Sequence, residues 1–307
     1  MIHTLSFQSL SVSQTFTPKP DPGFLEIESR DENLDLLNDL PALGLAIVGS
    51  RLPQRRSCEH LERVMAELRG SGLIILSGLA RGIDSRSHEL ALEHGLKTVA
   101  VLGNGIDVDY PRENRHLRRR IVEAGGLVIS QFPRGTAPLK GNFLNRNQLI
   151  AGFAKAVWVV EAAAISGTLN TAKHAASFNR DLYATSCFPG DPIFEGNERL
   201  ISEQRTDRYP VAKPLFNAQS LAPTWTALGN PKPEPSAFRP ETLLQRWVIE
   251  LQGEYGECPV QALMNHAYGQ GLTLGKFYLQ YEKELEQGKL VQDADGRVNL
   301  VRSSRPA

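Results

Sequence analysis

The densest group of side chains suited to ligand binding lies in the run FPRGTAPLKGNFLNRNQ, at residues 132–148. It combines the cations Lys140 and Arg146, the amide Asn147 and the aromatic Phe143. Lysine and arginine pair with phosphates, amides bond to base edges, and an aromatic ring offers a face on which any base stacks. A phenylalanine alone more often packs in a core. Its interleaving with cations and amides favours a surface for single-stranded nucleic acid.

Three turns rich in glycine and small hydroxyl residues are candidate anion-binding sites. They lie at residues 49–51, 77–84 and 166–168, each after an apolar run and before a helical pattern. Such turns expose backbone N–H groups at a helix start, and Arg51 and Arg81 add fixed positive charge. Tight turns and helix caps that bind nothing fit the same residues. The candidate anion-binding residues are Gly49, Ser50, Ser77, Gly78, Gly82, Ser166, Gly167 and Thr168.

The chain shows no complete set of residues for catalysis or for metal binding. Glu161 ends an apolar run without a histidine or a second carboxylate at a recognisable spacing. The cysteines Cys58, Cys187 and Cys258 are too scattered for a metal knuckle. The run PRENRHLRRR contains five arginines, but helical spacing spreads them over more than one face and indicates a solvated helix. We therefore expect a binding protein that is not an enzyme and has no cofactor and no metal.

The candidate residues fall between elements that alternate along the chain. Apolar runs such as LGLAIVGS and AVWVVEA lack period-two polarity, and helical patterns such as CEHLERVMAELRGSG separate them. Strands buried on both faces and joined through helices indicate an α/β fold, a Rossmann-like doubly wound parallel sheet. Ligands in such folds bind at the carboxyl ends of the strands. The turns and the loop singled out above lie at those ends.

Four parts are expected along the chain. Residues 1–40 are an acidic N-terminal extension with net charge −5, residues 41–215 the Rossmann-like domain, residues 216–240 a proline-rich linker and residues 241–303 a small domain. In the small domain, three amphipathic helical patterns precede two strands joined by a DG turn, which is the order of a winged helix. Because residues 241–307 carry a net charge of −2, we expect this domain not to bind DNA.

Composition excludes several classes of protein. The 307 residues are 41% hydrophobic and 22% charged, which is typical of folded domains, and Lys+Arg and Asp+Glu each number 34. Whole-molecule attraction to a polyanion is thus excluded, although residues 41–200 carry a net charge of +5. The longest nearly apolar stretch, residues 149–165, contains two charges, and the chain start lacks a secretory pattern. We expect a cytoplasmic protein with no membrane partner.

Several of these runs follow one another in an order that resembles the DNA-processing protein A family, also called DprA or Smf. They are AIVGSR, SGLARGID, GIDVDYP, FPRGTAPLKGNF with the RN and IAG after it, and VVEA with SGTLNTA after it, all within residues 45–201. Gln131, Gln148 and the run SCFPG depart from the family pattern. The resemblance implies a domain that binds and protects single-stranded DNA without catalysis. It also implies a homodimer that loads a RecA-type recombinase in natural transformation or DNA recombination.

The resemblance also assigns roles to particular residues. The DNA-contacting positions that it implies are Arg51, Arg81, Lys140, Phe143, Arg146 and Asn147. It places a dimer interface near Leu200 and Ile201, and it leaves transformation, general recombination and defence open as the setting. An alternative is a nucleotide-processing hydrolase of the lysine-decarboxylase-like Rossmann group, which also has glycine-rich loops at strand ends. The PGG-x-GT-x-x-E signature of that group is absent here.

Overall fold

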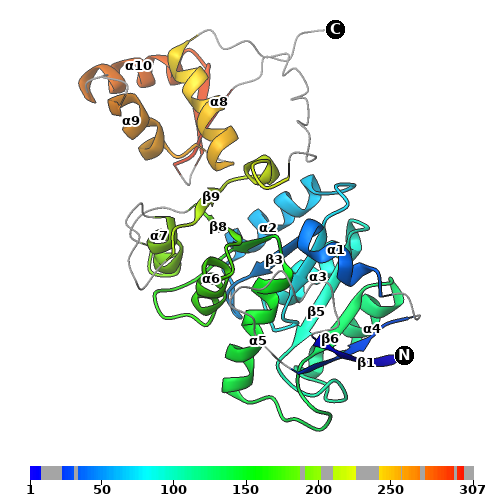
Figure 1. The fold of residues 1–307 in the computed structure, drawn as a ribbon. Coiled ribbons are helices and arrows are strands. Elements are labelled where there is room, and N and C mark those ends of the chain that lie inside the picture. The colour runs from blue at the N-terminus through cyan, green and yellow to red at the C-terminus, as the bar shows by residue number, and fades with distance from the viewer. Residues whose placement is uncertain are drawn as a thin grey trace, which may run out of the picture. The chain divides into compact units, whose positions relative to one another are not determined.

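The chain divides into two compact units, Met1–Ala227 and Leu228–Ala307 (Figure 1). The computed structural model describes residues 1–7, 23–30, 34–186, 191–201, 210–225, 242–256, 258–269, 274–293 and 296–300. Cys187 and most of the expected linker, residues 226–240, lie outside these ranges. Across the described ranges, no helix is both long and apolar enough to cross a membrane.

The first unit is built on a nine-stranded sheet with the order β1-β2-β6-β5-β4-β3-β7-β8-β9. Strands β3 to β9 pair in parallel, whereas β1 and β2 run antiparallel at one edge. This confirms the predicted α/β Rossmann-like doubly wound sheet. The strands are β1 (Ile2–Ser6), β2 (Phe24–Glu28), β3 (Gly44–Val48), β4 (Ile74–Ser77), β5 (Lys97–Leu102), β6 (Leu127–Ser130), β7 (Ala156–Val159), β8 (Asp181–Thr185) and β9 (Lys213–Leu215).

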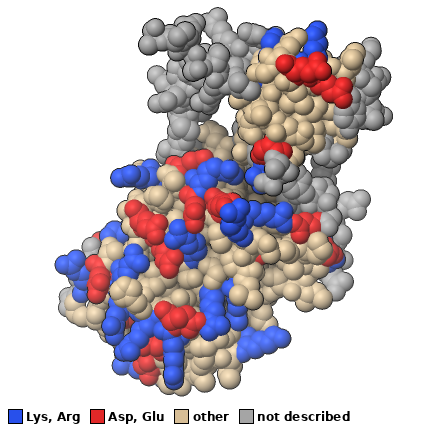
Figure 2. Space-filling model, turned by 180° about the vertical axis from the view of Figure 1, so that it is seen from behind, with Lys and Arg blue, Asp and Glu red and all other residues tan. Residues whose placement is uncertain are grey.

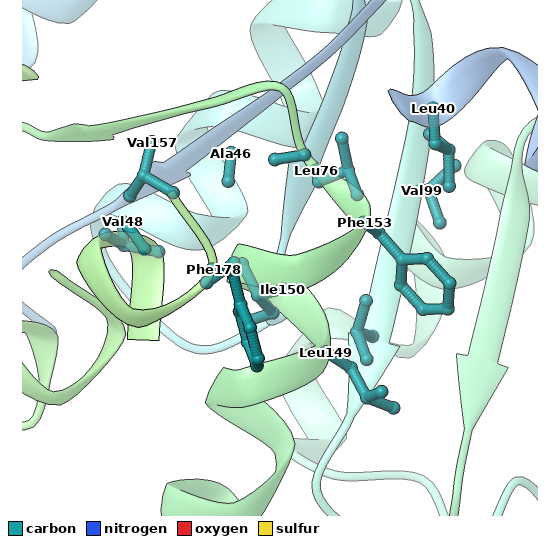
Figure 3. Packing of buried hydrophobic residues seen from close by; sticks show 14 of the residues in the cluster. Leu40, Ala46, Val48, Leu76, Val99, Leu149, Ile150, Phe153, Val157 and Phe178 are labelled. Atoms are coloured by element: carbon teal, nitrogen blue, oxygen red, sulfur yellow. The ribbon is translucent and has the colours of Figure 1, made fainter. Parts of the chain in front are cut away.

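Helices cover both faces of this sheet (Figure 1). Val99 and Val101 of β5 face α1, α5 and α6, whereas Ala100 and Leu102 face the side of α3 and α4, because successive side chains of a strand point to opposite faces. In Figure 3, Phe153 of α5 lies in the first of these two layers. The helices are α1 (Leu36–Leu43), α2 (Arg55–Glu67), α3 (Ile83–Glu93), α4 (Arg115–Glu123), α5 (Lys140–Phe153), α6 (Thr168–Ser177) and α7 (Glu195–Ile201).

The fold begins earlier than the sequence predicts. Residues 1–40 were expected to form an extension outside the Rossmann-like domain, but β1 and β2 extend its sheet and α1 packs on it. The acidic residues of β2 have internal partners, since Glu26 pairs with Arg134 at 2.8 Å and Glu28 with Arg118 at 2.6 Å. Two of the seven acids that suggested a separate segment thus neutralise arginines of the domain itself.

The second unit contains three helices followed by a hairpin, in the predicted order. The elements are α8 (Leu243–Tyr255), α9 (Val260–Gly269), α10 (Leu274–Glu286), β10 (Leu290–Gln292) and β11 (Val298–Leu300). Thr242 caps α8 with a capping box, and Leu244, Phe277 and Val298 share a small apolar core. The assignment of this unit as a winged helix stays a prediction.

Candidate nucleic-acid interface

The topology creates a crevice between β3 and β7. The chain leaves β3 for β4, β5 and β6 on one side and returns to β7 on the other, so the strand order reverses at this pair. Val48 lies opposite Val159 in the parallel register, which brings the carboxyl ends of both strands to the same edge. A reversal of this kind leaves a crevice outside the carboxyl ends. The structure has a cavity of about 670 Å³ there, walled by the turns after β3 and β7 and by α5.

Two exposed cations lie at this cavity, which we call the large cavity. Arg51 follows β3, and Lys140 is the first residue of α5. Among the described residues, neither forms an ion pair with a carboxylate. The loop singled out in the sequence gives way to α5 at Lys140, with no acidic residue in the first turn of the helix. The positive end of the helix dipole disfavours a cation such as Lys140 at the N-terminus of α5. A bound anion at this position is favoured by the dipole and by the Lys140 charge.

Phe143 lines the same cavity and is half-buried. Its ring centroid lies 5.5 Å from that of Tyr110, and the Cζ of Arg51 lies 5.5 Å from the Phe143 centroid. A Cβ at Gly103, just after β5, would collide with the Phe143 ring, so the glycine makes room for it. The structure thus places Arg51, Lys140 and Phe143 together, as the sequence suggests.

Arg146 lies beneath this group with 4% of its surface exposed. Its Nη1 donates to the carbonyl oxygens of Gly78, at 2.8 Å, and Val101, and its Cζ lies 6.0 Å from the Phe143 centroid. Burial lowers the pKa of Arg146 to about 10, which still leaves it charged at neutral pH. Arg146 therefore supports the floor of the site. It does not present its guanidinium to solvent.

Asn147 and the turn after β7, residues 166–168, line another side of the large cavity. Asn147 Nδ2 donates to the Gly167 carbonyl at 3.4 Å and to Asn170 Oδ1 at 3.3 Å, which ties α5 to α6. Thr168 Oγ1 donates to the Gly49 carbonyl at 3.2 Å and so joins the turns after β7 and β3. The candidate anion-binding residues that line this cavity are Gly49, Ser50, Ser166, Gly167 and Thr168.

The remaining predicted anion-binding residues, Ser77, Gly78 and Gly82, do not line the large cavity, although Ala80 and Asp84 of the same turn do. Ser77 is buried, and its hydroxyl donates to the Ile47 carbonyl at 2.6 Å, which is a bond within the sheet. Gly82 has a φ of 75°, and a Cβ there would collide with the Ser50 carbonyl, so it allows the turns after β3 and β4 to touch. Gly78 lines a second cavity of about 240 Å³, which we call the small cavity.

Arg81 also lines the small cavity, and it carries a carboxylate partner. It pairs with Glu113, and both side chains are largely exposed, at 65% and 46%. Exposed pairs contribute little to stability, so a phosphate can compete with Glu113 for Arg81. The arginine-rich run that ends in α4 is mixed in role, because Arg118 is buried and bonded to Glu28 and Asp109, whereas Arg119 is exposed.

Charge on the wider surface is mixed as well. Figure 2 shows Lys and Arg interspersed with Asp and Glu on the face that it displays. This agrees with the balanced totals of 34 basic and 34 acidic residues. Attraction of a polyanion therefore depends on local groups such as Arg51 and Lys140.

Tyr110 and Ile165 have no counterpart among the predicted site residues, whereas Asp84 ends the predicted turn at residues 77–84. Tyr110 belongs to the run GIDVDYP, and Ile165, on the rim of the large cavity, is 98% exposed. Asp84 accepts from the Gly78 amide at 3.1 Å, and burial raises the pKa of its carboxyl. The Tyr-Pro pair after an apolar strand is a signal for Tyr110 that sequence reasoning left unused, whereas Ile165 has none.

Glu161 is buried at the back of the large cavity. Its Oε2 accepts from the Gln54 amide at 2.8 Å and from the Ser57 hydroxyl at 2.6 Å, so it caps the N-terminus of α2. No group of three or more histidine, cysteine, aspartate or glutamate residues that could hold a metal occurs within the part of the chain that the structure describes. The carboxylate that sequence analysis singled out thus has a structural role.

The residues expected at a dimer interface lie at the end of α7. Leu200 is fully buried in the core of its own chain, and Ile201 packs partly buried against the same core. Leu200 therefore presents no side chain to a partner, and an interface here would depend on Ile201 and its surroundings. The homodimer stays a prediction.

Comparison with known proteins gives consistent matches. The family model for DNA recombination-mediator protein A matches residues 33–217. Protein Smf of Synechocystis is 38% identical over 211 residues, which cover 65% of this chain and 51% of that protein. The chain spans about half the length of the curated relatives it matches.

Two solved structures share the fold. DNA processing protein A of Streptococcus pneumoniae has a TM-score of 0.63 and 33% identity, over 72% of this chain and 74% of that one. DNA processing protein A of Helicobacter pylori, described for its single-stranded DNA binding mode, has a TM-score of 0.61 and 28% identity, over 73% and 95%. Sequence and fold thus agree on one family.

Proposed function

The chain belongs to the DNA recombination-mediator protein A family, and we propose that it binds single-stranded DNA at the large cavity. The observation that carries this proposal is the grouping of Arg51 and Lys140, without carboxylate partners among the described residues, around the half-buried ring of Phe143. Cations beside an aromatic platform suit a chain of phosphates with unstacked bases. The similarity to a Helicobacter pylori protein described as binding single-stranded DNA supports the same reading.

The geometry favours single strands over duplex. Phe143 lies in a recess at the carboxyl ends of the strands, and a base reaches its ring only after leaving the stack of bases in its own strand. Extruding a base from a duplex costs a few kcal/mol, whereas a single strand offers its bases freely. Because stacking on an aromatic ring tolerates any base, binding has little sequence preference.

The carboxylates of the site support binding without catalysis. Glu161 accepts two hydrogen bonds at the start of α2, and Asp84 accepts one from Gly78 at the start of α3. General acid–base chemistry needs a group within reach of substrate and free to exchange a proton. Both carboxylates line the large cavity but are already engaged, by backbone amides and, for Glu161, also by the Ser57 hydroxyl, which argues against the nucleotide-processing hydrolase that the sequence leaves as the alternative.

Family membership supports a proposal for the wider role. We propose that the protein protects single-stranded DNA and loads a RecA-type recombinase, as a homodimer, in natural transformation or DNA recombination. The second unit is proposed as a winged helix that does not bind DNA. Its α10 carries the exposed pair Glu282 and Lys283, and the unit's net negative charge opposes a polyanion.

A paired assay tests binding against hydrolysis. Fluorescence anisotropy with a labelled oligonucleotide should show binding by the wild type and loss of affinity in the double variant Arg51→Ala/Lys140→Ala. Arg119→Ala is the matched control, since Arg119 is an exposed arginine on α4 that lines neither cavity. Incubation with nucleoside monophosphates should release no free base. Base release without oligonucleotide binding would establish the hydrolase and refute the proposal.

A further inference from the structure

The surface at the two cavities is apolar as well as cationic. Of the large apolar side chains that the first unit exposes within the described ranges, four line the cavities, namely Leu52, Tyr110, Leu144 and Ile165. The others are Met1, Ile2, Leu139 and Val211. Exposed apolar side chains that are scattered singly need no explanation, whereas a gathering of them at one place marks a surface that meets a ligand.

Ile165 is the most exposed side chain of this group. It lies in the turn between β7 and α6, and 98% of its surface is accessible to solvent, so it contributes almost nothing to the core of its own unit. The chain carries no charged residue from 162 to 172, and Ala162 and Ala163 line the large cavity together with Ile165. This side of the large cavity is therefore apolar and uncharged.

Two more exposed leucines come from other elements of the site. Leu52 follows Arg51 and is 86% exposed, and its amide donates to the Ser50 hydroxyl at 3.2 Å within the turn after β3. Leu144 follows Phe143 on α5 and is 40% exposed. We call Leu52, Leu144 and Ile165 the apolar rim. The rim thus comes from the same three elements that wall the large cavity.

Single-stranded and duplex DNA present different groups to such a rim. A duplex keeps its bases stacked inside and brings phosphates to the surface that it approaches. A phosphate that loses water against an apolar side chain gains no partner, which costs free energy. A single strand can turn unstacked bases toward the protein, and the faces of a base are apolar. Contact with the rim therefore favours the single strand alone.

We propose that the apolar rim, and Ile165 above all, contacts unstacked bases of a single strand bound at the large cavity and so adds to the preference for single strands over duplex. The proposal rests on the proposed function and deepens it. Arg51 and Lys140 attract the phosphates of either form of DNA, whereas Ile165, which lines the same cavity, discriminates between the two forms.

Removing the apolar surface of Ile165 tests this inference. The probe is a labelled strand of mixed sequence, titrated by fluorescence anisotropy alone and annealed to its complement. Ile165→Ser should weaken single-strand binding by about 4- to 12-fold, the effect of covering about half of a large aliphatic side chain. Duplex affinity and the salt dependence of single-strand binding should stay as in the wild type, because no phosphate contact is removed.

A cation at the same position gives the opposite change. Ile165→Lys should strengthen duplex binding and steepen its dependence on salt by about one phosphate contact, so that the preference for single strands falls. Val211→Ser and Val211→Lys are the matched controls, because Val211 is 46% exposed in the same unit and lines neither cavity. Both should keep the wild-type preference. Thermal melting checks that each variant stays folded.

The outcomes separate this inference from the function on which it rests. Wild-type affinity of folded Ile165→Ser for the single strand, or equal weakening of both forms of DNA, would overturn the role of the rim while single-strand binding stands. Duplex binding that Ile165→Lys leaves unchanged would overturn it as well. Light scattering that shows Ile165→Ser to lose self-association, with DNA affinity intact, would assign the rim to a second copy of this chain instead. Failure of the wild type to bind the single strand would refute the proposed function itself.

Discussion

Removing the Phe143 ring probes the stacking contribution without changing charge. In Phe143→Ala the protein loses the Tyr110 contact and the interaction with Arg51, each 5.5 Å from the ring centroid. An aromatic pair contributes about 0.5–1.5 kcal/mol and an exposed cation–π contact about 0.5–1 kcal/mol. These two contacts sum to about 1–2.5 kcal/mol, and the lost burial of the half-buried ring and the longer Arg146 contact raise the total to about 2.5–4.5 kcal/mol. This is still below a typical unfolding free energy of about 5–15 kcal/mol. The variant should therefore stay folded.

Phe143→Ala should affect DNA affinity more visibly than it affects folding. A base stacked on an aromatic ring contributes about 1–3 kcal/mol, so Phe143→Ala should weaken single-strand binding by about 5- to 150-fold. The salt dependence of single-strand binding should not change, because the substitution removes no phosphate contact. Phe143→Trp should retain most of the affinity, whereas Phe143→Leu should keep the packing but lose the stacking. Gly103→Ala should also weaken binding although it leaves the Phe143 side chain intact, because the added Cβ would displace the Phe143 ring.

Anisotropy titrations across a salt series, with thermal melting of the same samples, measure both effects. A folded Phe143→Ala variant with wild-type affinity would refute the stacking role. Unfolding of that variant, with Phe143→Leu folded and fully active, would show that the ring serves only to pack.

Three further outcomes follow from the charges of the site. Arg51→Ala and Lys140→Ala should each weaken binding and reduce the slope of log affinity against log salt by about one phosphate contact, and an unchanged slope would exclude phosphate contact there. Glu113→Gln should strengthen binding a few-fold in the same titration, because it frees Arg81 from its carboxylate; weaker binding would contradict this. His88 is fully buried, and burial lowers its pKa to about 3, so below its ordinary value of 6.5 only the unfolded chain takes up the proton. Stability should therefore fall by about 2 kcal/mol from this residue between about pH 7 and pH 5, as measured by urea unfolding, and His88→Gln should lack that part of the loss.

The sheet and the position of the site follow from local sequence patterns. Apolar runs without period-two polarity, such as AVWVVEA, indicate parallel strands because both of their faces are buried. Turn residues directly after those runs must lie at carboxyl ends of strands, and Arg51 and Ser166 both line the large cavity there. These predictions succeed because each depends only on neighbours in the chain.

The predictions that depend on long-range partners are the ones the structure changes. Glu26 and Glu28 suggest a solvated acidic segment until Arg134 and Arg118, about 90 or more residues later, are brought beside them. The sequence predicts Arg146 as a DNA contact. In the structure its guanidinium lies in the interior, in space that the absence of a side chain at Gly78 leaves open. No local pattern reveals these pairings, because they arise from the folding of distant segments against each other.

The most direct test of single-strand binding compares one sequence in two forms. Anisotropy titrations with a labelled single strand and with its duplex, at about 50 and 200 mM salt, measure affinity and its electrostatic part together. We predict tighter binding of the single strand at both salt concentrations, weaker binding of each form at the higher one, and loss of the preference in Phe143→Ala. Equal affinity for the two forms, or a preference for duplex, would contradict the assignment of the large cavity to single-stranded DNA.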